Sequence, residues 1–221
     1  MRSRTTILFI LLTALAVVMF VCDIVVGSVN LPFKDVIDTL LGRCSDATTR
    51  SIVIDIRLIK AIVALLAGVA LSLSGLQMQT LFRNPLAGPY VLGVSSGASF
   101  GVALFLLGAP LLGLSTSPAL AVIGTAGAAW IGAAAVLTLV IVLSRRIKDI
   151  MVILILGMML SSALGAVVEM LQFLSDEAAL KSFVVWTMGS LGSVTLNQLP
   201  FITIFTLIGL IISIILIKPL N

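Results

Sequence analysis

The stretch SGLQMQTLFRNPLAGPYVLGVSSGASFG, Ser74 to Gly101, decides the fold because it joins two apolar segments through a polar turn. Pro85 and Pro89 lie in the turn, and each proline removes a backbone N–H donor and disfavours helix at the residue before it. The apolar segment upstream of the turn carries one charge, Lys60, and the segment at residues 90–108 carries none. The pattern therefore predicts two apolar helices with a chain reversal between them.

The composition indicates a chain that lies mostly in a lipid bilayer. Of the 221 residues, 60% are hydrophobic and 10% are charged, whereas soluble domains carry about 25% charged residues. We therefore predict an all-α fold, a polytopic bundle of membrane helices. The net charge of +4 does not indicate nucleic-acid binding, because the basic residues flank apolar segments instead of forming a patch. Cys22 and Cys44 are predicted to be free thiols.

Six apolar segments are long enough to cross a membrane, since about 20 helical residues span the hydrocarbon core. The first segment also fits a signal peptide, but residues 27–30 make a poor cleavage site, which favours a span. Residues 30–55 are predicted to be a polar loop with a short amphipathic helix at 36–41, and residues 183–190 are apolar but too short to cross. The six predicted spans are residues 6–27, 58–80, 90–108, 118–143, 150–174 and 199–217.

The charges between the predicted spans indicate a cytoplasmic N-terminus. In that orientation the inside segments hold seven Lys or Arg residues, including Lys148, and one Asp. The outside segments and the adjoining span residues hold six Lys or Arg residues and eight acids, spread over longer loops. An excess of positive charge is typical of cytoplasmic loops.

Small residues recur at four-residue spacing in three of the predicted spans. Residues so spaced share a helical face, and small side chains let helices approach closely in lipid, where little hydrophobic force acts between them. Two interpretations remain open: the stripes only pack against neighbouring helices, or one stripe faces a conduit. The stripes are Gly93, Gly97 and Gly101; Gly124, Ala128 and Gly132; and Gly157, Ser161 and Gly165.

Glu169 continues the last of these stripes by one more four-residue step. A carboxylate within a bilayer is costly, and such groups usually face a bundle interior or water. Glu169 either reaches the interface near the outer end of its span or lines the outer part of a pathway with Gly157, Ser161 and Gly165. A secondary transporter that couples to an ion through Glu169 is therefore one candidate function.

Arg57 and Lys60 lie three residues apart at the outer end of the second predicted span and so share a helical face. They are either snorkelling anchors or a docking point for an acidic partner. The turn from Arg83 to Leu86 is predicted to lie at the inner end of the same span. The sequence has no histidine, HExxH motif or P-loop, which argues against triad chemistry, histidine metal sites and ATP hydrolysis by this chain.

Three blocks of the sequence resemble the FecCD-type permease subunits of bacterial ABC importers, which translocate iron-siderophore, haem or cobalamin-type substrates. The blocks occur in the family's order and cover most of the chain beyond Arg57. The resemblance implies a type II importer permease in the bacterial inner membrane, a two-fold homodimer surrounded by lipid. The implied partners are separate ATP-binding subunits and a periplasmic or lipoprotein substrate-binding protein, with no catalytic residue, cofactor, metal or nucleic acid on this chain. The blocks are IRLIKAIVALLAGVALSLSGLQMQ, RNPLAGPYVLGVSSGASFG and FVVWTMGSLGSVTLNQL.

The resemblance also implies roles for individual residues. Arg57 and Lys60 match the basic position that receives acidic residues of the binding protein, although Lys60 stands where the family more often has arginine. Residues 183–190 resemble the short outer helix that helps to close the periplasmic side. The implied cytoplasmic gate comprises Asn84, Leu86, Ser144 and Arg145.

The resemblance implies a longer chain than these 221 residues. Permeases of this family continue past the sixth span with an Ala/Gly-rich cytoplasmic segment, which docks on the ATPase, and with four further spans. We therefore expect the chain to be the N-terminal part of such a permease, six spans of a usual ten, and unable to couple transport to ATP by itself. A membrane anchoring or assembly subunit is the remaining alternative function.

Overall fold

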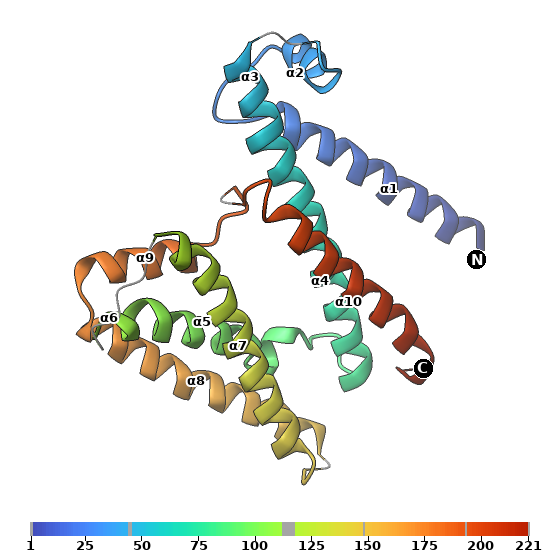
Figure 1. Cartoon of the computed structure of the whole chain (residues 1–221). Helices are drawn as coiled ribbons and strands as arrows, with labels where there is room; N and C mark the ends of the chain where they lie inside the picture. Colours follow the sequence, from blue (N-terminus) through green and yellow to red (C-terminus); the bar gives the residue numbers. More distant parts are fainter. Residues whose placement is uncertain (1, 44–45, 112–117, 148, 193, 221) are drawn as a thin grey trace. The chain divides into compact units, whose positions relative to one another are not determined.

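The fold is given by a computed structural model, which describes residues 2–43, 46–111, 118–147, 149–192 and 194–220. Every regular element in these ranges is helical, which confirms the all-α prediction. Cys44, Lys148 and most of the loop predicted at residues 109–117 lie outside the described residues. The elements, drawn in Figure 1, are α1 (Arg2–Val25), α2 (Phe33–Leu40), α3 (Ala47–Ser51), the π-helix η1 (Ile52–Leu58), α4 (Ile59–Phe82), the 3₁₀-helix η2 (Pro89–Leu92), α5 (Val94–Ala103), the π-helix η3 (Leu104–Gly108), α6 (Ala109–Leu111), α7 (Pro118–Ser144), α8 (Ile150–Leu174), α9 (Glu177–Met188) and α10 (Leu199–Leu220).

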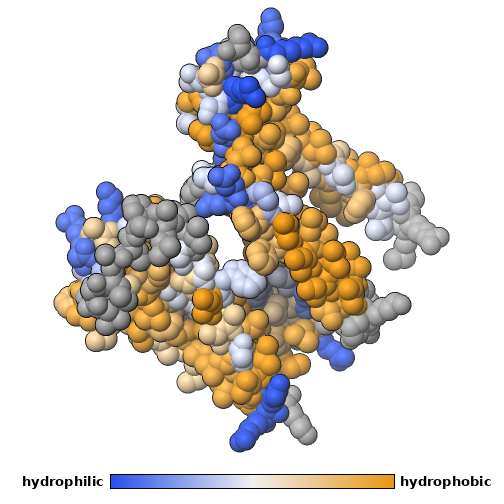
Figure 2. All heavy atoms as spheres, viewed as in Figure 1, coloured by the Kyte–Doolittle hydropathy of each residue, from blue (hydrophilic) through white to orange (hydrophobic). Residues whose placement is uncertain are grey.

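Within the described residues, four helices are long and apolar enough to cross a membrane, namely Arg4–Val25, Gly124–Ser144, Ile150–Leu174 and Leu199–Leu216. They match the first, fourth, fifth and sixth predicted spans, and Figure 2 shows the hydrophobic surface of α10. The second predicted span is the 24-residue helix α4. The third is divided among several short elements, so the count of six spans stays a prediction.

The third predicted span is not one continuous α-helix. Pro89 begins η2, where its missing N–H is tolerated. Gly93 then adopts a left-handed conformation with φ 78° as the N-cap of α5, a conformation that glycine reaches without a Cβ clash. Gly93 therefore lies at the start of α5, not inside one helix that runs from residue 90, and its carbonyl accepts from the Gly97 N–H at 2.8 Å. A Cβ added at Gly93 or at Gly97 would meet Val136, so both glycines face the same neighbour.

The described residues divide into two compact units. Unit 1 comprises Met1–Leu73 and Ser190–Lys218, and unit 2 comprises Ser74–Gly189 and Pro219–Asn221. The core of unit 1 joins the last turn of α1 to α2, η1 and the start of α4. Its buried side chains are Ile24, Val36, Val53 and Ala61.

In unit 1 the helix that leads into α4 begins earlier than the sequence predicts. The elements α3, η1 and α4 follow one another directly from Ala47, so the predicted loop ends near residue 46 and not at Asp55. The cause is Asp46, whose carboxylate accepts hydrogen bonds from the backbone N–H groups of Thr48 at 3.3 Å and Thr49 at 3.0 Å. These bonds satisfy donors that have no partner in the first turn of a helix.

The Asp46 cap predicts a pH dependence for α3. The Thr49 hydroxyl, followed by the backbone N–H groups of Thr49 and Thr48, lowers the pKa of Asp46 below its ordinary value of 3.8. The stabilisation of α3 is therefore complete at neutral pH and is lost as the pH falls through the lowered pKa. We expect Asp46→Ala to weaken amide-exchange protection at residues 48–51 at neutral pH, and the difference from wild type to shrink in acid, where the wild-type cap is itself lost. Asp46→Asn should keep a cap without the acid-induced loss; an equal loss in acid for both the Asn variant and the wild type would contradict this assignment.

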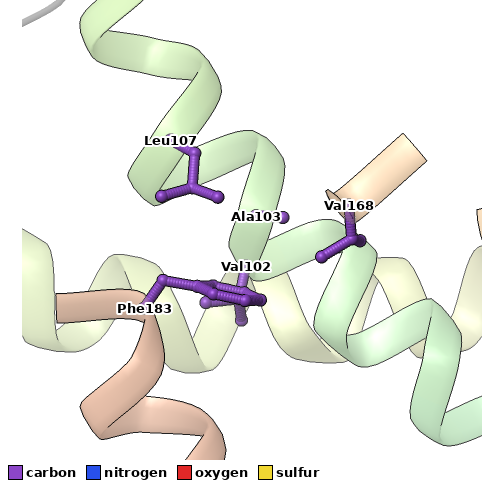
Figure 3. Packing of buried hydrophobic residues seen from close by; sticks show 5 residues of the cluster. All are labelled: Val102, Ala103, Leu107, Val168 and Phe183. Atoms are coloured by element: carbon purple, nitrogen blue, oxygen red, sulfur yellow. The ribbon is translucent and has the colours of Figure 1, made fainter. Parts of the chain in front are cut away.

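Unit 2 is a bundle in which α5 packs on α7 and α8 while α9 contacts η3 (Figure 1). The ring of Phe183, on α9, points toward Val102 of α5 (Figure 3). The rings of Phe183 and Trp186 stack with centroids 6.3 Å apart. The apolar segment predicted at 183–190 thus lies mostly within a longer helix that packs on the core. The buried core residues are Val102, Ala103, Leu107, Val168 and Phe183.

Candidate functional site

Arg57 lies in η1 and is buried, with 6% of its surface exposed. Its guanidinium donates to the backbone carbonyls of Ile24 at 3.1 Å and Val25 at 2.7 Å, and also to that of Val29. The carbonyls at a helix C-terminus have no intrahelical partner and carry partial negative charge. The planar five-donor guanidinium of Arg57 therefore caps the C-terminal end of α1 and ties it to η1.

Gly27 leaves the space that the Arg57 side chain occupies. A Cβ at Gly27 would lie 2.8 Å from Cζ, Nε and Nη2 of Arg57. The docking role implied for Arg57 stays a prediction. A carboxylate of another protein could bind this guanidinium only by replacing hydrogen bonds that it makes within the chain.

Lys60 differs from Arg57 in being exposed. Its Nζ lies 3.3 Å from Oδ1 of Asp23, and both side chains are partly open to solvent. Exposed ion pairs contribute little to stability, about 0–1 kcal/mol, so the pair leaves Lys60 free to exchange Asp23 for another carboxylate. Sequence reasoning missed Asp23 as its partner, because no local spacing joins residues 37 positions apart.

The turn after α4 is held by hydrogen bonds within itself. Arg83 has a positive φ of 46°, and the Asn84 N–H donates to the carbonyl of Gln79 at 3.1 Å. The side-chain oxygen of Asn84 accepts from the N–H of Leu86 at 2.9 Å, an Asx-turn. Leu86 is 80% exposed and so projects away from unit 2.

The turn between α7 and α8 contains the other two residues of the implied gate. The Ser144 hydroxyl donates to the carbonyl of Ile141 at 2.8 Å, and Arg145 is exposed. Asp149 caps α8 by accepting from the N–H of Met151 at 2.8 Å. Over the described part of the chain, no hydrogen bond or ion pair links this turn to the Asn84 turn, so the shared gate stays a prediction.

Backbone approaches backbone where the small-residue stripes of α5 and α7 meet. A Cβ at Gly101 would lie 2.1 Å from the carbonyl oxygen of Ala128, and one at Gly132 would lie 2.2 Å from the carbonyl oxygen of Gly97. Such distances leave no room for any side chain. Gly124 differs, because its near neighbour is a side chain: a Cβ there would lie 2.2 Å from Cζ of Phe105.

The stripe on α8 changes character along its length. Gly157 packs under η2, where a Cβ would lie 2.4 Å from the carbonyl oxygen of Val91, and the Ser161 hydroxyl donates to the Gly157 carbonyl at 2.8 Å. Gly165, in contrast, has no atom within 4 Å of a built Cβ, and Glu169 is exposed. The Gly157 end of this stripe therefore packs against a neighbouring element, and the Gly165 and Glu169 end is open within unit 2. A pathway role for the open end stays a prediction.

An apolar cavity of about 600 Å³ lies between α5, α7 and α8. Phe100, Leu104, Ile131, Leu139 and Leu160 are among its lining residues, and every side chain that lines it is apolar. A chelate or charged cofactor needs convergent polar groups, so this cavity does not fit one. The described residues likewise hold no cluster of three His, Cys, Asp or Glu side chains suited to a metal ion.

Comparison with known proteins identifies the family. The profile of the FecCD transport family matches residues 14–221. The hemin transport system permease protein HmuU of Yersinia pestis is 36% identical over 167 residues, 75% of this chain and 48% of that protein. The molybdate import system permease protein MolB of Haemophilus influenzae is 33% identical over 198 residues, 86% of this chain and 56% of that protein.

A third relative and a solved structure agree with these matches. The ferric enterobactin transport system permease protein FepD of Escherichia coli is 41% identical over 117 residues, 53% of this chain and 34% of that protein. A solved inward-facing metal-chelate type ABC transporter superposes with a TM-score of 0.78 at 30% identity, covering 98% of this chain and 64% of the solved one. The chain thus spans about half the length of the relatives it matches. With several apolar helices and this match along most of its length, the protein is a multi-pass membrane protein of the FecCD transport family.

Proposed function

We propose that the chain acts as a permease subunit of an ABC importer. The observation that carries the proposal is the family match over residues 14–221, which the fold-level similarity to a metal-chelate transporter supports. The substrate class we propose is an iron-siderophore, haem or cobalamin-type chelate. The name of the MolB relative makes molybdate the first other substrate to test.

The proposal includes partners that supply energy and selectivity. Separate ATP-binding subunits would hydrolyse ATP, so this chain would not itself be an enzyme. A substrate-binding protein would deliver the chelate from the outer side, and a second copy of the chain would complete the conduit. We propose six spans, surrounded by membrane lipid, with a cytoplasmic N-terminus in the bacterial inner membrane.

Each candidate residue has a proposed part in transport. Lys60 would dock the binding protein, and Arg57 would hold the adjoining end of α1 in place. On the cytoplasmic side, the exposed Leu86 and the turn at Asn84, with Ser144 and Arg145, would narrow the conduit. The open end of the α8 stripe, Gly165 and Glu169, would line its outer part, and a secondary transporter that uses Glu169 is not favoured because the relatives are ABC permeases.

The docking role of Lys60 predicts a charge-reversal effect. Lys60→Glu places a carboxylate beside Asp23 and should weaken binding of the substrate-binding protein about tenfold, with a smaller salt dependence than the wild type. The matched control is Lys34→Glu, the same change at an exposed lysine of the same unit. Affinities measured in nanodiscs at two salt concentrations test the prediction. An equal loss for both lysines would indicate only a general charge effect.

Co-purification tests the proposed assembly. The product of the chromosomal gene, carrying an affinity tag, would be extracted in mild detergent from cells grown under iron limitation. We expect a Walker-motif ATPase to co-purify in stoichiometric amount. A tagged protein that is recovered intact and without an ATPase would favour the anchoring function instead.

A further inference from the structure

Helix α2 presents an apolar stripe that the described residues leave exposed. Phe33 is 58% exposed and Leu41, at its C-cap, 59% exposed, and Ile37 and Leu40 are also exposed. These four residues follow the spacing i, i+4, i+7 and i+8, so they form one continuous strip along the helix. A strip of exposed large apolar side chains on a loop helix indicates a surface that something apolar covers.

The other apolar side of α2 is already used in packing. Val36 is 1% exposed and belongs to the buried cluster that includes Ile24 and Val53, and Thr39 is buried beside it. The Thr39 hydroxyl also donates to the carbonyl of Asp35 at 2.6 Å. The exposed stripe is therefore a second apolar sector, separate from the one that attaches the helix to the protein.

Charged residues occupy the remaining sector of α2. By helical spacing, Lys34, Asp35 and Asp38 lie on the arc between the stripe and the buried residues. The helix thus has one face on protein, one face suited to water and one face suited to hydrocarbon. This three-way division is typical of a helix lying in the plane of a membrane interface.

The packing of Val36 places α2 at the boundary of the bilayer. Its contact Ile24 lies in the last turn of the apolar segment Arg4–Val25, of which the described residues bury only a small part. Since a span of that length ends where the hydrocarbon ends, α2 is held at the depth of the headgroup region. Figure 2 shows hydrophilic residues among apolar ones at the end of unit 1 formed by α2 and α3.

We propose that α2 is an interfacial anchor, whose stripe of Phe33, Ile37, Leu40 and Leu41 inserts into the acyl–headgroup boundary of the leaflet at the C-terminal end of α1. Lipid is the occupant because the uncovered surface of α1 meets the same membrane, and α2 packs on the end of that span. The anchor fixes the height of the segment that carries Arg57 and Lys60 above the bilayer. Four apolar side chains inserted into the membrane interface are enough to orient a helix that packing on α1 already holds there.

Spin labels on single cysteines test the anchor. Phe33→Cys, Ile37→Cys and Leu40→Cys report on the stripe, and Lys34→Cys and Asp38→Cys are matched controls on the charged face, all in a Cys22→Ser, Cys44→Ser background. In vesicles of phosphatidylcholine and phosphatidylglycerol, we expect the ratio of collisions with oxygen to collisions with a water-soluble nickel chelate to be at least about fivefold higher on the stripe. Equal ratios on both faces would overturn the proposal, as would stripe labels that neither reagent reaches, because a protein would then cover the stripe.

A second measurement uses the unchanged chain and does not depend on the folding of variants. Phosphatidylcholine with a photoactivatable diazirine near its headgroup is added to the same vesicles, and adducts are mapped by mass spectrometry. We expect adducts at Phe33, Ile37, Leu40 or Leu41 at a level comparable with the end of α1. Adducts confined to α1 and absent from residues 33–41 would overturn the proposal.

Discussion

Gly132→Ala is expected to destabilise unit 2 by roughly 3 kcal/mol, the upper part of the range for overpacked cores. The added Cβ would lie 2.2 Å from the carbonyl oxygen of Gly97 and 3.0 Å from the Cα of Gly101. Both contacts are backbone atoms, so no side chain can rotate away and α5 must separate from α7. Close backbone contact is what associates helices in lipid, so the loss should appear as a lower SDS fraction at half-unfolding in mixed micelles.

Gly127→Ala is the matched control on the same helix. Gly127 has no atom within 4 Å of a built Cβ, and alanine is a better helix former than glycine by about 1 kcal/mol. We expect this variant to be as stable as the wild type or slightly more stable. If the two variants unfold alike, the close packing of α5 on α7 is contradicted.

Arg57→Leu is expected to destabilise unit 1 by roughly 2–3 kcal/mol, because hydrogen bonds from a charged donor are lost and carbonyls at the end of α1 are left without a partner. Arg57→Lys should recover only part of this, since an ammonium cannot present the planar fork of the guanidinium. Lys60→Leu, three residues away, removes an exposed ion pair and should cost less than about 1 kcal/mol. The rate at which a protease cleaves the α1–α2 segment in bilayers, compared between each variant and the wild type, measures these differences in stability.

A double-mutant cycle sharpens the test of the Arg57 cap. Gly27→Ala alone should be destabilising because its Cβ would meet the guanidinium at 2.8 Å. In the Arg57→Leu background the guanidinium is absent and this clash is gone. The double variant should therefore be destabilised by less than the sum of the two single variants. Strictly additive effects would show that Arg57 does not occupy this space in the folded protein.

Sequence patterns were sufficient where a single property of a long segment decides the structure. The apolar runs predicted α1, α7, α8 and α10 because burial in lipid requires about 20 consecutive apolar residues. Sequence patterns failed where a few residues determine the local structure. Asp46 begins a helix in a segment whose polar composition predicts a loop, and Gly93 interrupts a segment whose uniform apolarity predicts one span.

Contacts between distant segments could not be predicted from spacing alone. The four-residue stripes left packing and a conduit as alternatives, and they did not indicate that Gly101 meets Ala128 or that Gly157 packs against Val91. The position of Arg57 on a helix was correct, but its partners lie about 30 residues earlier, in a loop and helix end with no sequence marker. The capping contacts of Arg57 could therefore be found only from the tertiary structure, and its docking role stays a prediction.

The most direct test of the permease assignment is the energy source of substrate uptake in cells with the chromosomal gene intact or disrupted. Uptake of labelled ferric siderophore, haem, cobalamin and molybdate is measured after ATP is depleted and, separately, after the ion gradients are collapsed. For an ABC permease we expect gene-dependent uptake of one of these substrates that stops without ATP and persists without the gradients. Gene-dependent uptake that follows the gradients, or no gene-dependent uptake of any of the four, would contradict it.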